Sequence, residues 1–255
     1  MKYPLIKLLL AMAPIALVSA CGGGDGDDGL SDRLDIADPK VRFIDAVPLS
    51  PNLTLYRGDV AQPDATNVGY KFASKYYDVD SSQATWSVKT TTGNITVGSF
   101  DLNPSRGNKY TIVALPGSTA SDLAVIRDPY NKSLTSDKAH VRVLNASFNQ
   151  ADVDVYLTPA STDLATTSPT FAGVAYKAAV PATDNDSLEF NGGAYQLRIT
   201  AKNSKTVIFT APVTVGNNAD WLVLTLPDLT APGGVKVLLA KSDDDGKTTE
   251  EIVSQ

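Results

Sequence analysis

The sequence predicts an all-β protein with two tandem immunoglobulin-like antiparallel β-sandwich domains, which follow a signal peptide and a flexible tether. Three observations support this fold class. Apolar residues recur at every second position in many short runs, turns rich in Gly and Asn separate these runs, and two parts of the chain resemble each other at an offset of 100 positions. We find no segment whose apolar residues follow a helical period for more than a couple of turns.

The first 20 residues have the pattern of a secretory signal peptide. Two lysines, Lys2 and Lys7, precede an apolar run that ends at Val18, and this order matches the charged and apolar regions of an export signal. The run is shorter than the roughly 20 apolar residues that cross a bilayer as a helix. We therefore predict that residues 1–20 are removed on export.

Cys21 is the only cysteine, and Val18-Ser19-Ala20 before it resembles the bacterial lipobox, in which the cysteine receives lipid on its sulfur. We predict that Cys21 is lipidated and that this lipid holds the mature protein to a membrane. The alternative is an unpaired thiol beside an ordinary cleavage site. Gly22 differs from the aspartate that resembles an inner-membrane retention signal. In a Gram-negative cell we therefore expect the outer membrane, on either its periplasmic or its surface face.

Residues 21–39 form the predicted tether, because glycine and aspartate dominate its start and few apolar side chains could offset the entropy of ordering it. Asp25, Asp27 and Asp28 suggest a calcium loop, but that pattern also needs a bidentate Glu at a fixed spacing. No Glu lies at that spacing after these residues or after residues 243–246. With one His and one Cys in the chain, His/Cys metal clusters are ruled out. We expect no metal and no cofactor.

The mature chain is acidic. Removal of residues 1–20 takes away two lysines and no acids, which leaves 20 Lys and Arg against 28 Asp and Glu and a net charge of −8. No cluster of basic residues forms a stripe that could neutralise phosphates. The charge therefore argues against a nucleic-acid partner and against contact with anionic lipid head groups.

An internal repeat divides the rest of the chain into two domains. Val41-Arg42-Phe43-Ile44-Asp45-Ala46 aligns with Val141-Arg142-Val143-Leu144-Asn145-Ala146, and Leu53-Thr54-Leu55-Tyr56 aligns with Val153-Asp154-Val155-Tyr156. Further on, Asn108 to Leu115 resembles Asn218 to Thr225 at a longer offset. We predict a first domain over residues 40–137, a second over 138–241 and a polar tail over 242–255.

The paired stretches that begin at Val41 and Val141 resemble the opening signature of the family of the domain of unknown function 4397 (DUF4397). That signature reads as an apolar strand, a turn rich in small residues, Pro and Asp, and a second strand like Val-Asp-Val-Tyr; the first copy departs from it with Leu53-Thr54-Leu55. The resemblance covers most of residues 40–241. It implies an exported, often lipidated protein of tandem β domains, and it implies no activity or site.

The sequence gives no reason to expect a catalytic site. The single histidine, His140, lies where the second copy begins, and no Gly-x-Ser-x-Gly elbow or phosphate-binding glycine loop is present. A pair of carboxylates, as in glycosidases, depends on spacing in the fold, and nothing singles out Glu189 with any particular Asp. We interpret His140 as an ordinary surface or interdomain residue.

Aromatic residues suggest a binding surface instead. Trp86 alternates in phase with Ala84 and Val88, and Trp221 with Val223, so both tryptophans are expected in the cores. Tyr76 and Tyr77 are adjacent and point to opposite faces of an extended strand. At least one of them should therefore be exposed, in a small ligand-binding patch.

These observations favour a non-enzymatic lipoprotein of the cell envelope that acts by binding or adhesion. The expected partners are the membrane, through the lipid on Cys21, and an envelope protein, peptidoglycan or another glycan. Two other roles stay open: a structural spacer that binds no saturable ligand, and a hydrolase that uses His140 or a pair of carboxylates.

Overall fold

The computed structural model describes residues 37–117, 122–129, 136–242 and 248–255. The predicted signal peptide, Cys21, the tether up to residue 36 and the acidic residues 243–246 lie outside the described residues, so their roles stay predictions. The described chain consists of strands and one short 3-10 turn, which confirms the all-β fold class. Within the described ranges, no helix is long and apolar enough to span a bilayer.

Residues 40–128 form two sheets that face each other as the first sandwich. The inner sheet has the order β4-β1-β7-β8 and the outer sheet β3-β2-β5-β6. The elements are β1 (Lys40–Asp45), β2 (Leu53–Arg57), β3 (Val60–Ala61), the turn η1 (Pro63–Ala65), β4 (Tyr77–Asp78), β5 (Ala84–Thr90), β6 (Thr96–Leu102), β7 (Lys109–Leu115) and β8 (Asp122–Asp128).

Residues 139–252 form the second sandwich in the same way. Its inner sheet has the order β12-β9-β16-β17-β18, with β13 also paired to β9, and its outer sheet the order β11-β10-β14-β15. The elements are β9 (Ala139–Asn145), β10 (Asp152–Thr158), β11 (Phe171–Ala175), β12 (Ala179–Val180), β13 (Leu188–Phe190), β14 (Gly193–Ala201), β15 (Val207–Val215), β16 (Asp220–Pro227), β17 (Val235–Lys241) and β18 (Thr249–Ile252).

Neighbouring strands are antiparallel except for one pair in each inner sheet: β1 runs parallel to β7, and β9 runs parallel to β16. The registers of these two parallel pairs also correct the alignment of the repeat. Val41 lies opposite Tyr110, and Val141 lies opposite Trp221, so Tyr110 corresponds to Trp221, whereas the sequence comparison set it against Asp220. Because side chains alternate between faces, this slip of one residue exchanges the positions that face the core of the sandwich with those that face the other inner sheet.

Each sandwich has its own apolar core. The core of the first includes Phe43 and Trp86, and that of the second includes Phe171 and Trp221. Trp86 is fully buried and Trp221 is 6% exposed. The core positions predicted for both tryptophans are therefore confirmed.

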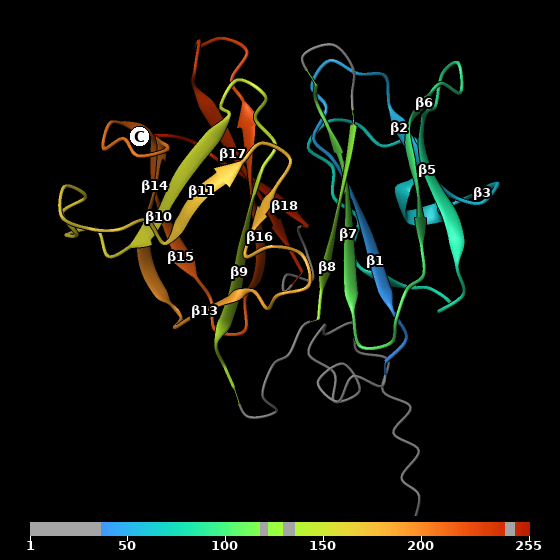
Figure 1. The fold of residues 1–255 in the computed structure, drawn as a ribbon, viewed down its shortest axis with the longest axis horizontal. Coiled ribbons are helices and arrows are strands. Elements are labelled where there is room, and N and C mark those ends of the chain that lie inside the picture. Colours follow the sequence, from blue (N-terminus) through green and yellow to red (C-terminus); the bar gives the residue numbers. More distant parts are fainter. Residues whose placement is uncertain (1–36, 118–121, 130–135, 243–247) are drawn as a thin grey trace, which may run out of the picture.

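A third core lies between the two inner sheets, which pack face to face. Ile44 and Leu115 from the first sandwich meet Leu144, Leu224 and Leu226 from the second. Every residue of β7, β9 and β16 is consequently buried, on both faces of its strand. The molecule is thus a stack of four sheets, outer, inner, inner and outer, as Figure 1 shows from β2 and β5 on one side to β10 and β14 on the other.

Charged side chains are buried at one end of this interface. Lys109 Nζ lies 3.5 Å from Asp220 Oδ2, and the two side chains are 4% and 11% exposed. Burial by itself would raise the pKa of Asp220, but attraction from Lys109 and Arg42 and a hydrogen bond from Ser242 outweigh it and hold the pKa below its ordinary value. A second pair, Arg142 and Asp128, crosses the same interface at 3.3 Å.

The end of the chain also connects the two sandwiches. We expected residues 242–255 to be a polar tail, but β18 within them pairs with β17 as an edge strand of the inner sheet. Glu251 on β18 forms an ion pair of 2.6 Å with Lys71 of the first sandwich. After β18, the Gln255 amide donates a hydrogen bond to the Thr210 carbonyl on β15. The polar composition of β18 therefore reflects an edge strand with charged partners.

Asp45 and Asn145 occupy matching positions at the ends of β1 and β9. Each accepts a hydrogen bond from the backbone amide two residues later. The Asn145 amide also donates to the carbonyls of Gln150 and Val174, whereas Oδ2 of the fully buried Asp45 has no hydrogen-bond partner among the described residues. Burial raises the pKa of Asp45 to about 7, although the bond from Val47 opposes this rise.

We predict that Asp45→Asn stabilises the protein and that the gain grows with pH. Unfolded Asp45 ionises near pH 4 while the folded group stays protonated up to about pH 7, so folding loses stability between these pH values. The gain should be small at pH 4 and about 4 kcal/mol at pH 8, as measured by urea unfolding. Asn145→Asp should show the opposite dependence. A gain from Asp45→Asn that does not change with pH would contradict the assignment.

We predict that Lys109→Met lowers the free energy of unfolding by about 3–5 kcal/mol, because it removes a partner of the buried Asp220. Lys202→Met makes the same change at a pair with Asp152 whose lysine side chain is 48% exposed, and it should cost less than about 1 kcal/mol. Urea unfolding of both variants measures the difference. Equal losses would show that the buried pair has no special role.

Candidate functional site

The structure places Tyr76 and Tyr77 on opposite faces, as their adjacency predicts, and both side chains are half-buried. The Tyr76 hydroxyl is 2.8 Å from Thr111 Oγ1, and the Arg42 guanidinium lies 4.6 Å from the ring centroid. Tyr77 packs against the core of the first sandwich. Burial raises the pKa of both hydroxyls. Each ring contacts packed residues and is only half-buried, so the ligand-binding patch at Tyr76 and Tyr77 stays a prediction.

His140 lies in β9 and is 2% exposed. It is paired in register with Glu189 of β13, and its Nε2 lies 3.8 Å from Glu189 Oε1. Ser242 and Asp220 are joined by a hydrogen bond close by, through the Asp220 carboxylate whose pKa His140 also lowers. In the part of the chain that the structure describes, no three His, Cys, Asp or Glu side chains gather into a group that could hold a metal ion.

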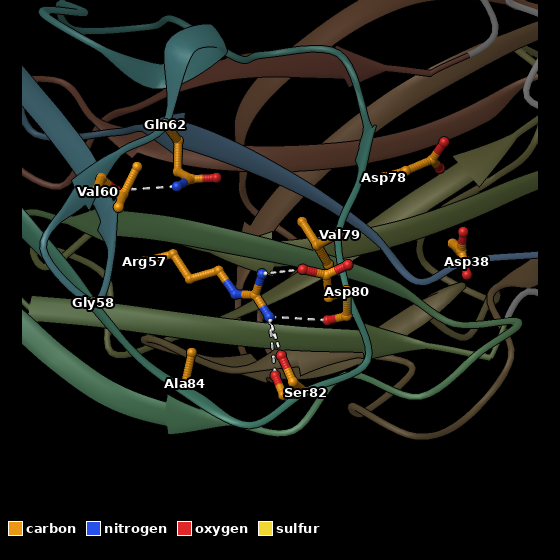
Figure 2. Close-up of a pocket in the computed structure, with 10 residues that line it drawn as sticks. All are labelled: Asp38, Arg57, Gly58, Val60, Gln62, Asp78, Val79, Asp80, Ser82 and Ala84. Carbon is orange, nitrogen blue, oxygen red and sulfur yellow. Dashed lines mark hydrogen bonds and ion pairs between the residues drawn. The ribbon is translucent and has the colours of Figure 1, made fainter.

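A polar hollow of about 530 Å³ opens at the edge of the first sandwich, and we call it the Arg57 hollow (Figure 2). Strands of both sheets line it, because β4 supplies Asp78 while β2, β3 and β5 supply Arg57, Val60 and Ala84. The complete lining is Asp38, Arg57, Gly58, Val60, Gln62, Asp78, Val79, Asp80, Ser82 and Ala84.

The Arg57 guanidinium is fixed in the wall of this hollow. Its Nη2 donates to the Asp80 carbonyl at 3.1 Å and to the carbonyl and hydroxyl of Ser82 at 3.0 and 2.9 Å. Its Nη1 lies 3.3 Å from Asp80 Oδ2, and the group is 5.9 Å from the centroid of the Trp86 ring. These contacts hold the guanidinium in place without a ligand, and Figure 2 shows those with Asp80 and Ser82.

The Arg57 hollow carries more negative than positive charge, with three aspartates and one arginine in its lining. Asp78 lies on β4, the edge strand of the inner sheet, and Asp80 lies in the loop after it; both are exposed. Sequence reasoning missed this site because its residues come from three separate stretches of the chain, at position 38, over 57–62 and over 78–84. The run Asp78-Val79-Asp80-Ser81-Ser82 was the one local feature that could have drawn attention to it.

A second hollow, of about 550 Å³, lies on the outer face of β10 and β11, and we call it the Lys205 hollow. Its lining includes Asp154 and Tyr156 of the Val-Asp-Val-Tyr stretch, which face away from the core. Asp154 accepts hydrogen bonds from the backbone amides of Gly173 and Asn203. This aspartate therefore anchors β11 and the turn between β14 and β15.

The first copy makes the same anchor with other residues. Thr54 takes the place of Asp154, and its hydroxyl accepts a hydrogen bond from the Asn67 amide at 3.0 Å. Asn67 and Gly173 both have φ of 58°, a left-handed conformation that Gly and Asn adopt more readily than other residues. The first copy departs from the signature by having Thr54 in place of an aspartate, but it keeps the hydrogen bond to a backbone amide of the neighbouring segment.

No curated protein matches the chain. Among solved structures, the chain is similar to a family 41 carbohydrate-binding module from streptococcal virulence factors, which is described for alpha-glucan recognition. The identity is 14%, the alignment covers 78% of this chain and 96% of that chain, and the TM-score is 0.23. It is also similar to the family 26 module CBMbc of Eubacterium rectale Amy13K, solved with maltoheptaose, with 9% identity, coverage of 83% and 100% and a TM-score of 0.23. Superpositions at this TM-score carry no argument about this chain.

The sequence model of the family described as "Domain of unknown function (DUF4397)" matches residues 39–156. This range covers the whole first sandwich, and in the second it covers β9 and β10 as far as residue 156. It is shorter than the span of residues 40–241 that the resemblance suggested, and it includes both copies of the paired stretches. The match confirms the predicted resemblance to the DUF4397 family over residues 39–156.

Proposed function

We propose that the protein is a non-enzymatic binding module of the cell envelope, held there by lipid on Cys21, and that the Arg57 hollow binds a neutral glycan. One observation carries the proposal: the hollow is preformed, because hydrogen bonds within the protein already immobilise Arg57. A site that needs no ordering on binding retains more of its contact energy as affinity.

The lining matches the chemistry of sugar hydroxyls, which both donate and accept hydrogen bonds. Asp38 and Asp78 supply acceptors, and Gln62 has an amide carbonyl for which the structure shows no partner among the described residues. Val60, which is 67% exposed, offers an apolar surface for the C–H face of a ring. The excess of carboxylates disfavours anionic sugars, since like charges repel at short range.

The rigid stack supports a binding role for the whole protein. The inner sheets share a core, and ion pairs such as Lys177 with Asp122 and Arg127 with Asp184 join the sandwiches at their edges. The hollows of the two sandwiches are therefore presented in a constant relative orientation. A spacer would bind no ligand saturably, and a hydrolase would cleave the ligand that it binds. Assays of binding and of cleavage therefore distinguish the three roles.

We predict that Asp78→Asn weakens binding of a neutral oligosaccharide about 10- to 100-fold, because a hydrogen bond to a charged group is worth about 1.5–3 kcal/mol. The measurement is titration calorimetry of the full chain in detergent with chitotriose, cellotriose and maltotriose. Asp64→Asn is the matched control, since Asp64 is an exposed aspartate of η1 outside the hollow. Absence of saturable binding would favour the spacer role, and cleavage of a sugar would favour the hydrolase.

We predict that Cys21→Ala moves the protein from the membrane fraction to the soluble fraction of source cells, because the acyl chains provide the attachment. Ser19→Ala keeps a small residue in the lipobox and should leave the protein membrane-bound. Protease treatment of intact cells then reports the face: digestion of the lipidated protein indicates the surface, and protection indicates the periplasm. Membrane association that persists in Cys21→Ala would refute the lipid anchor.

A further inference from the structure

We propose that the Lys205 hollow is a second binding site, which takes an oxyanion group, namely a carboxylate, phosphate or sulfate, of a ligand. The site lies in the second sandwich and does not depend on the proposed role of the Arg57 hollow. Three features carry the proposal: a lysine held in place by uncharged partners, a lining in which lysines outnumber acids, and a carboxylate whose oxygens are already occupied.

The Lys205 ammonium is positioned at the rim by two groups without charge. Its Nζ is 3.1 Å from the Tyr156 hydroxyl and 2.6 Å from the Thr167 carbonyl, and it lies 5.1 Å from the centroid of the Tyr156 ring. An ammonium has three N–H donors. Two are used in these contacts, so one donor and the full positive charge remain for a ligand.

Lys202 adds a second positive charge from the same turn between β14 and β15. It approaches so closely that a Cβ on Gly173 would lie 3.3 Å from Lys202 Cε. Its Nζ is 3.5 Å from Asp152 Oδ1, in a pair whose lysine side chain is 48% exposed. Water weakens such a pair, and two donors of this ammonium stay available.

Asp154 is the one acid in the lining, and each of its carboxylate oxygens already accepts a hydrogen bond from the backbone. Its Oδ1 accepts the Gly173 amide at 2.7 Å and its Oδ2 accepts the Asn203 amide at 2.8 Å. The lining therefore offers donors and two positive charges against one negative charge, while Asp152 outside the lining pairs with Lys202. This balance is the reverse of that in the Arg57 hollow, and it is notable in a mature chain whose net charge is −8.

An oxyanion would form charge-assisted hydrogen bonds with Lys202 and Lys205, and these are stronger than bonds between neutral groups. Because the hollow is open to solvent, salt should screen the attraction. Binding should therefore weaken as ionic strength rises. A ligand held by neutral hydrogen bonds would show little such dependence.

The test is titration calorimetry of the full chain at low ionic strength with trigalacturonate, inorganic phosphate and inorganic sulfate as probes. Lys205→Gln, which removes the charge and retains an amide donor, should weaken binding at least tenfold. Lys236→Gln is the matched control on β17, where Nζ lies 4.0 Å from Asp228, and it should bind like the wild type. The pattern of affinities among the probes identifies the kind of oxyanion.

Failure of all three probes to bind would overturn the proposal, and so would equal losses in Lys205→Gln and Lys236→Gln. Thermal melting of each variant shows whether a loss reflects unfolding. Asp78→Asn should leave the affinity for the oxyanion unchanged. The proposal for the Arg57 hollow and the proposal for the Lys205 hollow can therefore fail separately.

Discussion

The face-to-face packing of the two inner sheets is the constraint on which the rest of the structure depends. Ile44, Leu144 and Leu224 build its aliphatic part, and Lys109 with Asp220 builds its charged end. Apolar packing attracts without strong directionality, whereas a buried charge tolerates few geometries. The aliphatic part therefore stabilises the contact between the inner sheets, and the buried charges select one relative arrangement of the two sandwiches. That arrangement fixes the orientation of both outer sheets and both hollows.

Duplication followed by divergence explains why the interface can carry charges at all. Lys109 pairs in register with Lys40, and Asp220 pairs in the same way with His140, so Lys109 and Asp220 are matching positions of the two copies. Identical copies packed in this way would place like charges together. Opposite charges at matching positions favour contact between the first and second copies over contact between two equal ones, as complementary charges do in other interfaces.

The sequence predicted what depends on local pattern. Alternating residues such as Tyr195 to Ile199 lie in β14, and the phases of Trp86 and Trp221 placed both rings in cores. Local pattern could not predict the register of β16, the strand within residues 242–255 or the contact of Tyr76. Each depends on contacts between distant segments: Val141 with Trp221, Glu251 with Lys71, and Tyr76 with Thr111. Both hollows escaped prediction for the same reason.

The central claim is that the two sandwiches behave as one folding unit. Differential scanning calorimetry of the full chain tests it most directly, because a shared core makes unfolding of either sandwich expose the inner sheet of the other. We expect one transition in which the calorimetric and van't Hoff enthalpies agree. Two separate transitions, or a calorimetric enthalpy about twice the van't Hoff value, would show that the sandwiches unfold independently and would contradict the account.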